Sequence, residues 1–228
     1  MRKLFVLILT ALLSLPVYAV PVPILMYHHF TETETGTPMT TSSDAFRKHL
    51  TALQNAGYTT VTFADLLCYT ETGEGLPEKP VLLTSDDGYS SVITVALPIL
   101  REYGMTMSVA VVGSRMGQTE GIPHFSMEEA AGCGLELVSH TWNLHGPDGN
   151  GVLTETGTIS PEFIPDIRRM KEIPELNSAV FVYPYGKYSR DSEAVLQAMG
   201  YRITVTTEEG IAQIRKGGSL FGLPRIQP

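Results

Sequence analysis

Short apolar runs alternate with segments of helical period along the chain after position 19. Seven or eight of these runs have the β-branched character of strands, and they cover residues 23–27, 59–62, 81–85, 107–112, 135–139, 179–183, 203–206 and 222–226. Several are apolar at consecutive positions, which is typical of strands buried on both faces. Parallel strands joined by helices produce this alternation. The pattern predicts a single α/β domain, and a small α/β barrel fits it best.

Local chemistry predicts where the first helix begins and ends. Ser42 or Ser43 can cap its start, Phe46 and Leu50 recur at helical spacing, and Gly57 suits a left-handed exit. By contrast, residues 146–158 are rich in Gly, Thr, Asp and Asn and predict a long loop. Long loops inside compact domains are often functional, so we expect this loop to shape substrate choice.

Residues 1–19 have the pattern of a secretory signal peptide. Arg2 and Lys3 precede an apolar stretch over residues 4–15, and Ala19 is a small residue at the expected cleavage site. The apolar stretch is too short to span a bilayer. We therefore expect an exported domain over residues 20–228, periplasmic or secreted, with no stable membrane anchor.

Composition and charge narrow the range of partners. The chain is 43% apolar and 18% charged, which is ordinary for a globular protein. Removing residues 1–19 leaves 209 residues with a formal charge of −10 and no cluster of Lys or Arg. We expect no nucleic-acid partner, because such a domain cannot release phosphate counterions, and we expect a monomer. Cys68 and Cys133 are the only cysteines; they either pair in an oxidising compartment or remain separate buried thiols.

Two carboxylates follow one of the apolar strands. Asp86 and Asp87 come directly after residues 81–85, at the strand end where parallel α/β folds collect their sites. Adjacent carboxylates repel one another unless a cation separates them, and a metal bound to one would leave the other free as a base. The alternative is a solvated turn, because Asp-Gly is a common turn pair.

Two histidines follow another predicted strand. Residues 135–139 lead into His140, and His145 lies five residues later. Two imidazoles and one carboxylate form a facial set of three metal ligands that leaves positions open for water and substrate. Together with the Asp pair, this spacing predicts a metal site.

Two further strand ends carry candidate groups. After residues 179–183, Pro184 fixes the chain and a backbone N–H beyond it could face an oxyanion, although the string alone also fits an aromatic turn. At the end of the first strand, His28 is placed to act as a general acid, with His29 as the alternative. Two adjacent histidines on a strand cannot both face inward.

Three strings together resemble the motifs of the polysaccharide deacetylases, the NodB-homology family or carbohydrate esterase family 4. They are Thr-Ser-Asp-Asp-Gly-Tyr at 84–89, Ser-His-Thr at 139–141 followed by the second histidine, and Tyr-Pro-Tyr-Gly at 183–186. The resemblance spans nearly all of the chain after position 19. It implies a distorted (β/α)₇ barrel that holds one divalent metal, zinc first, with cobalt, nickel or iron as alternatives.

The resemblance also implies a role for each matching residue. Asp87, His140 and His145 would hold the metal, and Asp86 would be the catalytic base. The backbone N–H of Tyr185, the residue after the motif's proline, would help to hold the oxyanion.

The sequence departs from the family's pattern in three places. Ser85 replaces the usual Phe, and the arginine expected near Val182 is absent, which leaves Arg225 as a candidate substitute. The usual late Leu-x-His motif, which donates the acid histidine, is missing. One branch, the deacetylases of poly-β-1,6-N-acetylglucosamine, is similar in carrying that histidine in an N-terminal Tyr-His motif, and Tyr27-His28 fits it. The five-residue step between the two ligand histidines is also similar to that branch.

The implied activity is removal of acetyl groups from N-acetylglucosamine units of an extracellular or cell-wall polysaccharide. One alternative is an esterase that removes O-acetyl groups from a glycan, for which the acid His28 would matter less. Another is a non-catalytic glycan-binding protein, which the missing arginine favours and the retained Asp86 disfavours. Trp142, the only tryptophan, either stacks on sugar rings or packs beneath the metal loop.

Overall fold

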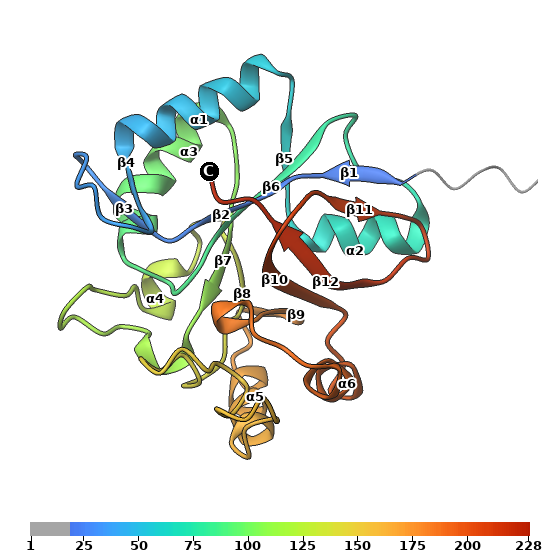
Figure 1. The fold of residues 1–228 in the computed structure, drawn as a ribbon. Coiled ribbons are helices and arrows are strands. Elements are labelled where there is room, and N and C mark those ends of the chain that lie inside the picture. Colours follow the sequence, from blue (N-terminus) through green and yellow to red (C-terminus); the bar gives the residue numbers. More distant parts are fainter. Residues whose placement is uncertain (1–18) are drawn as a thin grey trace, which may run out of the picture.

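A computed structural model describes residues 19–228, and its centre is a parallel sheet of seven strands curled into a nearly closed barrel (Figure 1). The strands follow the order β2 (Ile24–Tyr27), β6 (Pro80–Ser85), β7 (Ser108–Val111), β8 (Glu136–Ser139), β9 (Leu176–Val182), β10 (Ile203–Glu209) and β12 (Leu220–Arg225). The two outer strands meet because Met26 N donates to Ile226 O at 2.9 Å and Ile226 N donates to Ile24 O at 2.8 Å. The prediction of a distorted seven-stranded α/β barrel in one domain is confirmed.

An eighth parallel strand explains part of the distortion. β5 (Thr59–Val61) pairs with the start of β6, while β7 pairs with the end of β6 on the same edge. Each of the eight runs that predicted strands overlaps one of these strands. Four further strands of three residues each were not predicted: β1 (Val20–Val22) pairs with β11 (Ala212–Ile214), and β3 (His29–Thr31) pairs with β4 (Thr40–Ser42).

Helices surround the strands on the outside of the barrel, as Figure 1 shows. The main ones are α1 (Ser43–Asn55), α2 (Phe63–Thr72), α3 (Leu97–Tyr103), α5 (Phe163–Lys171) and α6 (Arg190–Ala198). The short ones are the π turn Val92–Ala96, the 3₁₀ turns Gly113–Arg115 and Pro184–Gly186, and α4 (Met127–Ala130). Of the two serines that could cap α1, Ser42 is the cap, because its hydroxyl accepts from Ala45 N at 3.2 Å.

Side chains of the strands alternate between the barrel interior and the surrounding helices. In β6, Leu82 belongs to the interior apolar cluster, whereas Val81 and Leu83 pack with α1 and α3 in another cluster. Both faces are therefore buried, which is why these strands appear as consecutive apolar residues in the sequence. The same period of two brings Asp86, four residues after Leu82, to the mouth of the barrel.

Two predictions concern other parts of the chain. The predicted signal peptide lies outside the described residues apart from Ala19, so it stays a prediction. Within residues 19–228, the helices are all too short or too polar to cross a membrane. Cys68 and Cys133 are both free, and because Cys68 is exposed and Cys133 is half-buried, the expectation of two buried thiols is wrong.

Candidate active site

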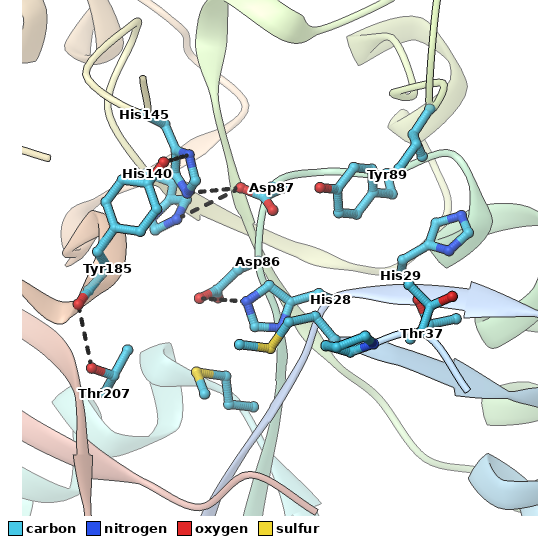
Figure 2. Close-up of a pocket in the computed structure, with 15 residues that line it drawn as sticks. His28, His29, Thr37, Asp86, Asp87, Tyr89, His140, His145, Tyr185 and Thr207 are labelled. Carbon is cyan, nitrogen blue, oxygen red and sulfur yellow. Dashed lines mark hydrogen bonds and ion pairs between the residues drawn. The ribbon is translucent and has the colours of Figure 1, made fainter. Parts of the chain in front are cut away.

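The C-terminal ends of the parallel strands open into a cavity of about 300 Å³ (Figure 2). Parallel barrels place their functional groups at this end, because the loops that follow the strands converge there. The lining includes almost every residue that the sequence singled out: His28, His29, Asp86, Asp87, His140, His145 and Tyr185, together with Met26, Thr37, Pro38, Met39, Thr40, Tyr89, Ile122 and Thr207.

Three of these residues form a set of metal donors. One ligand atom from each of Asp87, His140 and His145 can be chosen so that all three lie within 4.8 Å of one another. His145 Nε2 is 3.1 Å and His140 Nε2 is 3.9 Å from Asp87 Oδ1. That oxygen is buried and accepts no hydrogen bond within the described part of the chain.

The charge state of the two histidines suits a cation. Burial lowers the pKa of His140, and burial together with the neighbouring His140 lowers the pKa of His145 to about 4. Both rings are therefore neutral at pH 7. His140 Nδ1 is 2.7 Å from Val182 O, and since a carbonyl only accepts, Nδ1 carries the proton and Nε2 keeps its lone pair toward Asp87. A neutral imidazole nitrogen and a carboxylate oxygen both offer lone pairs, so a divalent metal between them would fit this arrangement.

Asp86 is held by an arginine from the opposite edge of the sheet. Arg225, at the end of β12, donates from Nη1 to Asp86 Oδ1 at 2.8 Å and from Nη2 to Oδ2 at 2.7 Å. Its Nε donates to Thr206 O at 2.9 Å, and the whole side chain is buried. Although burial alone would raise the pKa of Asp86, the charge and hydrogen bonds of Arg225 hold that pKa well below its usual range. Arg225 therefore pairs with Asp86, as expected of the candidate substitute for the arginine that is missing near Val182.

The two neighbouring histidines both border the cavity, which corrects the expectation that only one could face it. The chain leaves β2 after Tyr27 and starts β3 at His29, so strict alternation ends there. His28 Nε2 lies 4.0 Å from Asp86 Oδ2, as Figure 2 shows, whereas the His29 ring packs edge-on against Tyr89 with centroids 5.4 Å apart. His28 is thus the histidine placed beside the candidate base.

Backbone strain is concentrated at the cavity. Within the described chain, four residues other than glycine have positive φ: Met39 at 60°, Asp87 at 76°, Thr141 at 73° and Tyr185 at 58°. Three line the cavity and Thr141 follows a metal-donor histidine. Such conformations are unfavourable for these residues and are retained mostly at functional sites.

The turn that carries Tyr185 depends on its neighbours. Pro184, the first residue of the turn, is buried and does not line the cavity, so its part is to fix the backbone that presents Tyr185. Gly186 lies against Thr207, where an added Cβ would be 2.0 Å from the hydroxyl oxygen. Only glycine fits at that close approach.

Sequence reasoning missed the side chains that hold the loop between the two donor histidines. Asp166 of α5 accepts from Trp142 N and Asn143 N, both at 2.7 Å. Arg115 donates to His145 O at 2.6 Å and lies 3.8 Å from Asp87 Oδ1. Both act on backbone groups or across the fold, so neither leaves a motif in the sequence.

Trp142 is part of this loop, but its side chain does not line the cavity. An added Cβ on Gly113 would be 2.5 Å from the Trp142 ring, and the Arg169 guanidinium lies over the ring, 4.2 Å from its centroid. Of the two roles that the sequence left open, the structure therefore shows packing beneath the metal loop.

The chain belongs to the polysaccharide deacetylase family, whose sequence model matches residues 73–204, more than half of the chain. It is 27% identical over 205 residues to YxkH of Bacillus subtilis (strain 168), whose name gives polysaccharide deacetylase as a provisional activity; the match covers 90% of this chain and 70% of that protein. It is 29% identical over 231 residues to the poly-beta-1,6-N-acetyl-D-glucosamine N-deacetylase of Escherichia coli (strain K12). That match covers 82% of this chain but only 33% of the relative.

A solved structure has the same fold. The Streptococcus pyogenes deacetylase PplD, in complex with acetate, superposes with a TM-score of 0.74 at 23% identity, covering 92% of this chain and 93% of that one. The likeness covers the whole barrel, and with the family match it places the donor triad in a fold that other deacetylases use.

Proposed function

We propose that this protein is an exported, metal-dependent hydrolase that removes acetyl groups from N-acetylglucosamine units of a polysaccharide. One observation carries the proposal: an ion-paired, ionised carboxylate, Asp86, lies next to a donor set of Asp87, His140 and His145 in one cavity. A binding protein would not need a second ionised carboxylate beside the three metal donors. Zinc is our first choice of metal, because two imidazoles and one carboxylate are a common catalytic zinc set.

Each residue has a definite task in the hydrolysis. Asp86, oriented by Arg225, takes the proton of the attacking water as its oxygen adds to the acetamide carbon. The backbone N–H of Tyr185 donates to the carbonyl oxygen as negative charge develops there, a contribution worth about 3–4 kcal/mol per donor in other enzymes. When bound, the metal would act as a Lewis acid on that carbonyl.

The leaving group needs a proton before the C–N bond breaks. An amide nitrogen is a poor leaving group because its anion is very basic, so His28 donates the proton that releases it as an amine. The products are acetate and a glucosamine unit that is cationic at neutral pH. The position of His28 beside Asp86, 4.0 Å away, supports this assignment.

Support for the polymer class comes from the relatives and from two local features. The Escherichia coli relative is named for poly-beta-1,6-N-acetyl-D-glucosamine, and this chain has the Tyr27-His28 pair and the five-residue step between His140 and His145. We therefore propose a β-1,6-linked N-acetylglucosamine polymer as the first substrate to test.

The test is acetate release from β-1,6 and β-1,4 N-acetylglucosamine oligomers and from an O-acetylated xylan, with and without a chelator. We expect chelator-sensitive release from the amide substrates, and a loss of about 10²–10⁴-fold in activity for Asp86→Asn and for His28→Ala, with a much smaller effect of His29→Ala.

Three other outcomes would change the proposal. A larger loss of activity in His29→Ala than in His28→Ala would assign the acid to His29. Release from the xylan alone, tolerant of His28→Ala, would show an esterase. A protein that binds zinc but releases no acetate from any substrate would refute hydrolysis altogether.

A further inference from the structure

The side chain of Tyr185 makes contacts that its proposed backbone role does not require. Its phenol oxygen lies 3.1 Å from His145 Nδ1 and 2.5 Å from Gly146 O. The two rings are 4.5 Å apart between centroids, and Figure 2 shows Tyr185 directly beside His145. Tyr185 is 40% exposed, so burial of its ring does not explain this placement.

Counting protons decides the direction of these two hydrogen bonds. A phenol has one proton, and the carbonyl of Gly146 can only accept, so the phenol donates to Gly146 O. Its oxygen then faces His145 Nδ1 as an acceptor, and Nδ1 must carry the proton. The neutral His145 ring therefore keeps its lone pair on Nε2, the nitrogen that faces Asp87.

The other tautomer of His145 would compete with metal binding. A proton on Nε2 would take up the lone pair with which His145 would bind a metal. It would also point into the donor set, where Asp87 Oδ1 is 3.1 Å away. The phenol disfavours this tautomer by requiring the proton on the far side of the ring.

His140 has the same tautomer, but a main-chain carbonyl sets it instead of a phenol. Its Nδ1 donates to the main-chain carbonyl of Val182 at 2.7 Å, and its side chain is 2% exposed. The side chain of His145 is 14% exposed, and its Nδ1 lies 3.1 Å from the Tyr185 hydroxyl instead of the carbonyl of a neighbouring strand. We propose that the Tyr185 hydroxyl is a positioning group that sets the tautomer of His145 for metal binding, in addition to the role of the Tyr185 backbone. This inference rests on the metal site of the proposed function.

The experiment compares Tyr185→Phe with a matched control, Tyr188→Phe. Phenylalanine keeps the ring and the backbone at position 185 and removes only the hydroxyl. Tyr188 lies three residues further along and uses its hydroxyl on Glu208 at 3.2 Å, away from the donor set. Zinc affinity is measured by competition with a chromophoric chelator at one fixed pH. We expect Tyr185→Phe to weaken zinc binding by about 10–100-fold, as loss of such outer contacts does elsewhere, and Tyr188→Phe to leave it unchanged.

A second measurement reads the tautomer itself. Long-range ¹H–¹⁵N correlation spectra of the chelator-treated protein distinguish a protonated Nδ1 from a protonated Nε2 on each histidine. We expect Nδ1–H on His140 and His145 in the unmodified protein, and a shift of His145 alone toward Nε2–H in Tyr185→Phe. His140 serves as the internal reference, because its carbonyl partner is untouched.

The outcomes separate this inference from the proposed function. Weaker zinc binding together with the changed His145 tautomer would support it. An unchanged His145 tautomer in Tyr185→Phe, or a changed tautomer with full zinc affinity, would overturn it whatever the activity. If the unmodified protein bound no divalent metal at all, the metal site and the proposed function would fail first, and this inference with them.

Discussion

At the scale of single residues, the site depends on how each charge is compensated. Asp86 is buried and ionised, and the buried guanidinium of Arg225 is what makes that possible. The Asp-Asp motif was enough to predict that Asp86 is the catalytic base, but it did not identify the partner of Asp86. Arg225 is 139 residues away in the sequence and reaches Asp86 only when the last strand closes the barrel. A short motif can therefore identify a catalytic carboxylate without identifying the group that tunes it.

Replacing Arg225 by Met should destabilise the protein strongly. Removing one partner of a buried ion pair leaves the other charge uncompensated, which typically costs about 3–5 kcal/mol in the free energy of unfolding. We expect a loss of this size for Arg225→Met in urea denaturation of the chelator-treated protein, and we expect the zinc-loaded variant to release no acetate. The double variant Asp86→Leu/Arg225→Met should recover most of the stability and none of the activity. A single variant that lost less than about 1 kcal/mol would contradict a tight buried pair.

At the scale of elements, strands were predicted well and the supports of the metal loop were not. β6 and β7 are buried at every position, so apolar runs mark them clearly in the sequence, whereas the three-residue β5 is partly exposed. The four strands that were missed have three residues each, and β4 is entirely Ser and Thr. Contacts between an acidic side chain and a distant backbone, such as Asp166 on the loop after His140, follow no sequence period and need the fold to be seen.

Asp166→Asn should loosen the metal loop without disrupting the barrel. The carboxylate accepts one backbone N–H on each oxygen, whereas an amide has a single acceptor and would point an NH₂ group at the other donor. We expect a loss of about 1–3 kcal/mol in the free energy of unfolding and a measurable weakening of zinc binding. Asp148→Asn is the matched control, because Asp148 bonds only to Asn150 within the following loop. Equal zinc affinities in the two variants would show that Asp166 does not support the site.

At the scale of the whole molecule, one end of the barrel carries the candidate site and the other contributes to the stability of the fold. The C-terminal strand ends carry the cavity, the strained backbone and every proposed catalytic group. The opposite end carries Glu136, the first residue of β8, whose carboxylate joins the start of α2 to the two neighbouring strands, β7 and β9. Such a division is common in parallel barrels, where one face determines activity and the other stability.

Glu136 provides the test of that division. Its oxygens accept from Phe63 N at 2.8 Å, Ala64 N at 3.0 Å, Asn177 Nδ2 at 2.9 Å and Ser108 Oγ at 2.5 Å. The first two donors are N–H groups at the start of α2, where a helix has no partner of its own for them. Glu136→Gln keeps the size of the side chain but turns one acceptor into a donor that faces other donors. We expect a loss of about 2–3 kcal/mol in urea denaturation. Because the cavity lies at the other end of the barrel, kcat/KM for acetate release and the zinc affinity should stay within about twofold of the unmodified protein while it remains folded, a change of roughly 0.4 kcal/mol. A variant that kept its stability but lost activity would show that the two ends are coupled.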